Sequence, residues 1–261
     1  MEKLTGKWAL ITGASSGFGI DFAHALAERG ANLILVARRQ EPMQQLAATI
    51  SARHNVAVEL KAADLALPGS GLALKQHLDQ KKINVDILIN NAGCGLYGPF
   101  VEQPLAATLD MLQLNILSLT ELTHLFARSM IQRGEGHILL VASIGGYQAT
   151  PTYAAYGASK AYVLLFGEAL HEELKPHKVK LSVLSPGVSA TGFLAAAGQR
   201  TTPYQRLFMM QSRPVVDAGL AALFCGKPSV IPGLGNKLTI FGNRLAPRSL
   251  QSKIAYQLMK N

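Results

Sequence analysis

The 261-residue sequence has little cysteine, little charge and no long hydrophobic run. Cys94 and Cys225 are its only cysteines, too few for a disulfide framework and typical of a reducing cytoplasm. No apolar stretch reaches the ~18–20 residues that span a bilayer, and no small-residue cleavage site follows the amino terminus as in a secretory signal. No cysteine–histidine cluster has metal-ligand spacing. We therefore expect a cytoplasmic protein with no transmembrane segment and no bound metal.

Acidic residues are scarce in the last third of the chain. Up to Glu173 there are 13 Lys and Arg against 15 Asp and Glu, whereas from Leu174 onward 12 basic residues face Asp217 alone. This asymmetry favours an acidic partner, such as an acyl carrier protein, an anionic thioester or weakly a membrane surface. No recognition motif or interleaving of aromatic and basic residues indicates nucleic acid.

Short β-rich apolar runs alternate with helical patterns, which predicts βαβ units. The runs lack polar alternation, as expected for parallel strands covered on both faces. We expect one domain over residues 1–261, an α/β doubly wound parallel sheet of about seven strands with helices on both faces. The expected strands are Trp8–Thr12, Asn32–Ala37, Ala57–Ala62, Asp86–Asn90, His137–Ala142, Lys180–Leu184 and Lys237–Phe241. The expected helices include Gly19–Arg29, Glu41–Arg53, Leu105–Gln132 and Tyr153–Lys175.

Two segments depart from this alternation. Residues 188–213 are long and irregular and contain the apolar cluster Leu207–Met210, which indicates either a lid over a substrate or a helical excursion of the core. Residues 244–261 are predicted to form a small basic amphipathic helix, which packs on the surface or contacts a membrane.

A glycine-rich turn follows the first predicted strand and precedes the first helix. Its glycines permit a tight turn, close approach to a pyrophosphate and close strand–helix packing. The helix amino terminus adds unpaired N–H groups that bind an anion. The predicted contacts are Gly13, Ser15, Ser16, Gly17, Phe18 and Gly19.

The end of the second strand indicates which nicotinamide cofactor is used. An acid at this place binds the ribose 2′-hydroxyl of NAD, whereas an arginine accommodates the 2′-phosphate of NADP. Here Arg38 and Arg39 follow the strand, with no acid until Glu41. We therefore predict NADP(H), with Arg38 as the main contact and Arg39 as a second; the alternative is that both are only solvated. Further contacts are expected from Asp64 and Leu65 after the third strand and from Asn91, Ala92 and Gly93 after the fourth.

Tyr156 and Lys160 lie four residues apart in a predicted helix and therefore share one face of it. A lysine charge beside a phenol lowers the phenol pKa toward the range useful for acid–base catalysis. Ser143 ends the preceding buried strand, where its hydroxyl is placed to hold a substrate oxygen near Tyr156. Alone, Tyr-x-x-x-Lys also describes an ordinary surface pair.

These motifs together resemble the short-chain dehydrogenase/reductase family over nearly the whole chain. The resemblance is carried by Thr-Gly-x-x-x-Gly-x-Gly at 12–19, Asp64-Leu65, Asn90-Asn91-Ala92-Gly93, Asn115, Ser143, Tyr156-x-x-x-Lys160 and Pro186-Gly187 with Thr191. It implies a Rossmann-type fold and hydride transfer between nicotinamide and a carbonyl/alcohol pair.

The resemblance also implies roles for single residues. Tyr156 is then the general acid/base, and Ser143 orients the substrate oxygen. Lys160 binds the nicotinamide ribose and depresses the tyrosine pKa, and Asn115 anchors a water relay. The carboxamide is fixed by Pro186, Gly187, Val188 and Thr191. Thr12 and Asn90 are interpreted as structural ties between strand ends.

The sequence indicates the substrate class and the oligomeric state less directly than it indicates the cofactor. The residues predicted to face the substrate are apolar or aromatic and favour an apolar ketone, aldehyde or acyl group: Cys94, Leu96, Tyr97, Ile144, Tyr147, Tyr153, Phe193 and Leu194. A homodimer through the helices 105–132 and 153–175, or a homotetramer, is expected. Two further hypotheses are reduction of an imine or other double bond on the same scaffold, and a non-catalytic NADPH-binding sensor.

Overall fold

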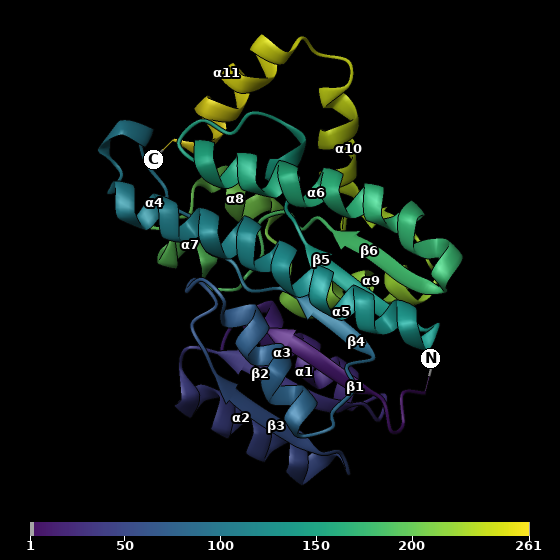
Figure 1. Ribbon diagram of the computed structural model, residues 1–261. Helices are drawn as coiled ribbons and strands as arrows, with labels where there is room; N and C mark the ends of the chain where they lie inside the picture. The colour runs from purple at the N-terminus through teal and green to yellow at the C-terminus, as the bar shows by residue number, and fades with distance from the viewer. Residues whose placement is uncertain (1–2, 261) are drawn as a thin grey trace.

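The computed structural model describes residues 3–260, apart from the side chain of Tyr204 (Figure 1). A sheet of seven strands runs through its centre in the order β3-β2-β1-β4-β5-β6-β7, and every neighbouring pair is parallel. The strands are β1 Trp8–Thr12, β2 Asn32–Ala37, β3 Val58–Ala62, β4 Ile87–Asn90, β5 Gly136–Val141, β6 Val179–Leu184 and β7 Ser229–Val230. The predicted doubly wound parallel sheet is confirmed.

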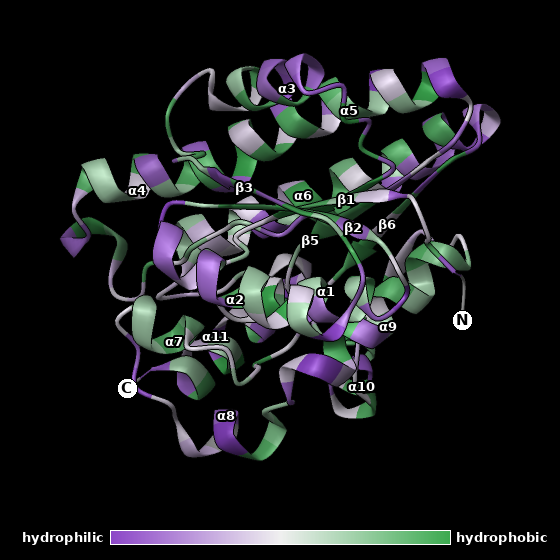
Figure 2. Cartoon of the chain, turned by 90° about the horizontal axis from the view of Figure 1, so that it is seen from below, coloured by the Kyte–Doolittle hydropathy of each residue, from purple (hydrophilic) through white to green (hydrophobic). Residues whose placement is uncertain are grey.

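Helices cover both faces of this sheet (Figure 2). One layer contains α1 (Phe18–Ala27), α2 (Gln40–Arg53) and α9 (Ser212–Phe224); the other contains α3 (Ser70–Gln80), α5 (Leu119–Arg133) and α6 (Ala154–Leu174). α4 (Leu105–Leu112) precedes α5, and the remaining helices are α7 (Phe193–Ala196), α8 (Pro203–Phe208), α10 (Leu234–Asn243) and α11 (Arg248–Met259).

Successive residues of each central strand enter opposite cores. In β1, Ala9 and Ile11 pack with α1 and α9, whereas Leu10 packs with α3 and α5. All three side chains are fully buried. This period of two explains why the strands read as continuous apolar runs: both faces of the sheet are covered, so neither demands polar residues.

The prediction of a strand at Lys237–Phe241 is wrong. This segment lies in α10, and the seventh strand is the two-residue β7 that pairs with Val183 and Leu184. The run Lys-Leu-Thr-Ile-Phe is rich in β-forming residues, yet Leu234, Leu238 and Phe241 recur at helical spacing. β7 was not predicted because a strand of two residues is too short to show a hydrophobic periodicity.

The carboxyl ends of the strands form the functional edge of the sheet. The strand order reverses between β1 and β4, and in open parallel sheets ligands bind at such a switch point. The loops after β1 to β6 all open there. Over residues 3–260 the structure holds no helix with the length and apolarity needed to cross a membrane.

Candidate active site

The glycine turn after β1 is shaped by close backbone contacts. Gly13 and Gly17 have φ values of +69° and +54°, which favour glycine. A Cβ on Gly19 would lie 2.2 Å from the Gly13 carbonyl oxygen, so only glycine lets α1 approach the turn this closely. No side chain caps the start of α1 in the described chain, and the N–H groups of Gly19 and Ile20 make only long backbone bonds of 3.2 Å to Ser16 and Gly17. The positive end of the helix therefore faces the turn, as an anion requires. The turn therefore fits a pyrophosphate.

Two arginines follow β2 at the rim of this turn. Arg38 and Arg39 are both exposed and both line the central cavity. Arg39 Nη2 donates to the Ser15 carbonyl oxygen at 3.4 Å and to Ser15 Oγ at 3.3 Å. Part of the Arg39 guanidinium is therefore already hydrogen-bonded to the glycine turn. The two guanidinium groups suit a phosphate beside the turn because they offer several parallel N–H donors.

The ends of β1 and β4 are tied together as predicted. Thr12 Oγ1 accepts from the backbone N–H groups of Asn91 and Ala92 at 2.9 Å each. Asn91 Nδ2 donates to the Thr12 carbonyl oxygen at 2.8 Å, and the Asn90 amide bonds to Leu119 and Thr123 in α5. The structural role predicted for Thr12 is confirmed by these hydrogen bonds, whereas Asn90 ties the end of β4 to helix α5 and not to a neighbouring strand end.

Asn115 lies at a break in a long helical segment. Between α4 and α5, residues Gln113–Ser118 form a π-helical turn, of the kind often found at functional sites. The buried Asn115 side chain donates to the Cys94 carbonyl oxygen (2.9 Å) and to Ser159 Oγ (3.1 Å), and accepts from the Cys94 N–H at 3.1 Å. It therefore fixes the loop after β4 against α6 at Ser159, the residue before Lys160.

Ser143 follows β5 and begins a short 3₁₀ turn, Ile144–Tyr147. Its Oγ accepts from the Gly145 N–H at 3.1 Å, which leaves the hydroxyl hydrogen free to donate. The Ser143 hydroxyl is also hydrogen-bonded to the phenol of Tyr156. β5 and α6 thus bring together two residues that are thirteen positions apart.

Tyr156 and Lys160 share one face of α6, but their electrostatics differ from the prediction. Lys160 Nζ donates to the Val141 carbonyl oxygen at 2.9 Å and lies 5.8 Å from the centre of the Tyr156 ring. Burial raises the pKa of Tyr156 to about 12, although the hydrogen bond with Ser143 opposes the rise. Burial lowers the pKa of Lys160 to about 8. The pKa of the phenol is therefore raised and not depressed as predicted, because desolvation by burial outweighs the opposing hydrogen bond with Ser143.

The segment after β6 closes the opposite wall of the site. Gly187 is in close contact with Asn236 of α10, since a Cβ there would lie 2.4 Å from Asn236 Oδ1. Thr191 packs against Gly17 of the glycine turn. Ser189 forms a bridge with Met210, so the two ends of segment 188–213 are joined. Within the segment lie α7 and α8, two short helices rather than an irregular loop.

One cavity of about 980 Å³ connects these parts. It is lined by nearly every residue predicted to bind the cofactor or to catalyse, except that Asn115 lies behind the wall and Gly19 beneath the turn. The lining residues among them are Gly13, Ser15, Ser16, Gly17, Phe18, Arg38, Arg39, Asp64, Leu65, Asn91, Ala92, Gly93, Ser143, Tyr156, Lys160, Pro186, Gly187, Val188 and Thr191. The glycine turn and the Ser143–Tyr156–Lys160 group therefore share one space.

The predicted substrate-facing residues divide into two sets. The cavity is lined by Cys94, Ile144, Tyr153, Phe193 and Leu194. Leu96, Tyr97 and Tyr147 do not line it, which corrects the prediction for these three.

Their surroundings explain the difference. Tyr97 packs against Tyr153, with ring centres 5.3 Å apart and ring planes tilted by 58°, and Tyr147 packs against the core between the sheet and α6. Leu96 is half-buried, and its carbonyl oxygen accepts from Gln103. Sequence proximity to a motif does not specify which way a loop side chain points.

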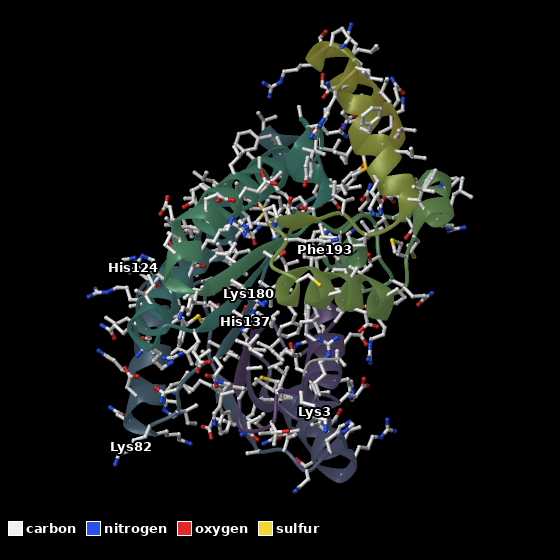
Figure 3. All side chains as sticks on the ribbon, turned by 90° about the vertical axis from the view of Figure 1, so that its right-hand side faces the viewer. Lys3, Lys82, His124, His137, Lys180 and Phe193 are labelled. Atoms are coloured by element: carbon white, nitrogen blue, oxygen red, sulfur yellow. The ribbon has the colours of Figure 1, made fainter. Side chains whose placement is uncertain are left out.

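The carboxyl-terminal helices supply a wall that the sequence did not predict. The cavity is also lined by Leu238, Thr239, Ile240, Gly242 and Asn243 of α10, and by Ala246, Gln251, Ile254, Ala255, Leu258 and Met259 in and before α11. The predicted basic helix 244–261 is thus α11 (residue 261 lies outside the described chain), and it packs over the site. Figure 3 labels Phe193, which lies beneath these helices.

A buried amide network holds α11 in this place. Gln199 Oε1 accepts from the Tyr153 hydroxyl at 3.0 Å and from Gln205 Nε2 at 3.1 Å, while Gln199 Nε2 donates to the Met259 carbonyl oxygen at 2.8 Å. Both glutamines are buried. Both lie in the polar stretch 199–206, where nothing in the sequence marks them as buried.

Comparison with known proteins agrees with this geometry. The profile of the family described as short chain dehydrogenase matches residues 7–202. The chain is 38% identical over 192 residues to a very-long-chain 3-oxoacyl-CoA reductase of Phaeosphaeria nodorum, covering 71% of this chain and 56% of that relative. It therefore spans little more than half the length of this relative.

Two solved structures are similar over more of their length. A short-chain dehydrogenase from Sphingobium yanoikuyae in complex with NADPH superimposes with a TM-score of 0.82 and 33% identity, covering 92% of this chain and 94% of that one. A bulky-bulky ketone specific alcohol dehydrogenase from Comamonas testosteroni gives a TM-score of 0.77 and 31% identity, over 92% and 93%. The chain belongs to the short-chain dehydrogenase/reductase family.

Proposed function

We propose that this protein is an NADPH-dependent reductase of large, apolar carbonyl compounds, with long-chain 3-oxoacyl thioesters and bulky ketones as the first candidates. The observation that carries the proposal is that Ser143, Tyr156 and Lys160 line the same cavity as the glycine turn and the two arginines after β2. The names of the acyl-CoA reductase and of the ketone-specific dehydrogenase support this class of substrate.

When bound, the nicotinamide would be held by residues of the Pro186–Thr191 segment and would supply hydride to the substrate carbonyl. Tyr156 is protonated up to about pH 12 and therefore carries the proton that the developing alkoxide takes. Ser143 Oγ accepts from the Gly145 N–H, so its hydroxyl hydrogen remains to be donated, and in this mechanism it is donated to the same oxygen. Both contacts strengthen as negative charge grows, so they stabilise the transition state more than the ground state.

Lys160 acts on the phenol after the proton has left. Its ammonium is anchored on the Val141 carbonyl oxygen and lies near the face of the Tyr156 ring. A positive charge there stabilises the tyrosinate that forms during reduction. Asn115 keeps the loop after β4 in place through Cys94, and Phe193 covers the Tyr156 ring with centres 5.2 Å apart, which excludes water from the proton transfer.

The size and lining of the cavity support the choice of a large apolar substrate. The cavity volume of about 980 Å³ is at the upper end for ligand sites. The cavity also extends past the residues that are predicted to contact the dinucleotide. Beyond Tyr156 the walls come from α7, α10 and α11 and include Leu194, Leu238, Ile254 and Leu258. Such walls favour a hydrocarbon chain over a sugar because each buried methylene contributes about 0.8 kcal/mol.

Initial-rate measurements with a chain-length series of 3-oxoacyl thioesters test the proposal. With NADPH, kcat/KM should rise by up to about fourfold for each methylene added until the cavity is filled. Bulky ketones should also be reduced. Preference for short polar keto acids, or consumption of NADPH with imines and with no carbonyl compound, would contradict the proposal.

The pKa of Lys160 predicts how cofactor capture depends on pH. The parameter kcat/KM for NADPH reports the free enzyme. Lys160 is a cation below about pH 8 and becomes neutral above it. We expect this parameter to be flat at lower pH and to fall above about pH 8. In Lys160→Arg the falling limb should move beyond the measurable range; a wild-type profile that stays flat to pH 10 would refute the assignment.

We propose a homodimer through α4, α5 and α6, which lie side by side (Figure 1). Four leucine side chains on these helices are 55–68% exposed: Leu105 and Leu109 of α4, Leu117 in the π-helical turn before α5, and Leu165 of α6. Light scattering should give a dimer for the wild type and a monomer for Leu165→Glu, because a buried unpaired carboxylate is unfavourable. Leu67→Glu, at an exposed leucine away from these helices, should remain dimeric; a dimeric Leu165→Glu would exclude this interface.

A further inference from the structure

The carboxyl-terminal helices expose a row of large apolar side chains. Leu234, Leu238 and Phe241 of α10, with Leu245 in the turn directly after it, are 73%, 61%, 59% and 78% exposed. Their spacing of four, three and four residues places them on one helix face. Leu250 of α11 adds another, 46% exposed. Scattered exposed leucines are ordinary, but an aligned row is typical of an interaction surface.

Basic residues accompany this row without any acid. After Asp217 the chain contains Lys227, Lys237, Arg244, Arg248, Lys253 and Lys260 and no Asp or Glu. All six are exposed. Figures 1 and 3 place α10 and α11 together at one end of the molecule, projecting from its body. This end therefore combines an apolar row with a purely positive charge.

The apolar row continues into the cavity. Leu238 of α10 and Ile254 of α11 are 61% and 48% exposed, and both also line the cavity. The polar side chains nearby are occupied with one another: Asn243 Nδ2 donates to Gln148 Oε1, and Gln251 Nε2 donates to the carbonyl oxygens of Asn243 and Ala246. An apolar path therefore leads from the outer surface to the site.

We propose that the surface formed by α10 and α11 docks on an anionic phospholipid surface, from which apolar substrates enter the cavity between Leu238 and Ile254. An amphipathic element with an apolar row and flanking cations inserts at the headgroup boundary and is held there by anionic lipids. A second copy of this chain is a poorer partner because it would bring the same positive charge to the contact. An acidic carrier protein would pair with the cations and leave the leucine row in water.

The docking is independent of the proposed reaction, whereas the entry of substrate rests on it. Flotation of the full chain with vesicles of phosphatidylcholine, with and without phosphatidylserine, tests the docking. We expect wild-type protein to float with the phosphatidylserine vesicles, and Leu245→Glu to lose this binding. Leu67→Glu, at a leucine 61% exposed in the loop after β3, the edge strand opposite β7, is the matched control and should float like the wild type. Arg244→Gln should weaken binding about fivefold, because each basic residue near the surface contributes about one kcal/mol.

Three outcomes would overturn the proposal. They are the absence of wild-type binding to phosphatidylserine vesicles, equal binding of Leu245→Glu, and the dissociation of a lipid-free dimer by Leu245→Glu. The last would make this surface an interface between copies. Activity assays with two substrates separate the docking proposal from the proposed reductase function. Leu245→Glu should reduce a water-soluble ketone at the wild-type rate, and it should lose activity only on a long-chain substrate dissolved in vesicles. Loss of turnover on both would point to damaged chemistry instead.

Discussion

Tyr156→Phe should lower kcat by about 10²–10⁴-fold while leaving the dissociation constant of NADPH nearly unchanged. The substitution removes the phenolic hydroxyl that interacts with Ser143, and it keeps the ring that packs against Phe193 and Tyr153. Single-turnover rates measure the chemical step, and fluorescence titration measures cofactor binding.

A second tyrosine of α6 provides the matched control. Tyr162 makes a hydroxyl contact of 2.9 Å with Thr120 on the outer face, away from the cavity. Tyr162→Phe removes the same atom from the same helix and should leave kcat within about twofold of the wild type. If Tyr156→Phe kept wild-type turnover, the assignment of the proton donor would be wrong.

Arg38→Ala should weaken NADPH binding by roughly 10- to 150-fold, because a hydrogen bond to a charged group contributes about 1.5–3 kcal/mol. NADH lacks the 2′-phosphate, so its binding should change little. Arg39→Ala should have a smaller effect, since Arg39 already donates to Ser15 and stabilises the turn. Isothermal titration with both cofactors gives the comparison.

Arg53→Ala, at an exposed arginine in the last turn of α2, controls for the loss of one positive charge. It should bind both cofactors as the wild type does. Equal losses for NADPH and NADH in Arg38→Ala would mean that the arginine supports the turn without selecting the phosphate.

Local patterns in the sequence were sufficient where a motif and its element are contiguous. The turn between β1 and α1, the pair Tyr156 and Lys160 on one helix face, and the tie made by Thr12 depend on neighbours in the chain or on adjacent strand ends. The parallel sheet follows in the same way from the alternation of apolar runs and helical patterns.

Features set by distant contacts were not predictable in this way. α11 covers the cavity because Gln199 bonds to Met259, sixty positions further along the chain. The pKa of Tyr156 rises because the surrounding fold buries it, and the lysine four residues away turns to the Val141 carbonyl. Lys237–Phe241 was expected as a strand because its composition is β-rich, whereas the helical spacing of the leucines around it prevailed.

Transfer of deuterium from cofactor to product tests the central claim most directly. The enzyme is given NADPH deuterated at the transferable position of the nicotinamide together with a long-chain 3-oxoacyl thioester, and the alcohol is examined by mass spectrometry. We expect one deuterium on the new carbinol carbon for each NADPH consumed, and none in Tyr156→Phe over the same period. Oxidation of NADPH without deuterium in an alcohol product would contradict it.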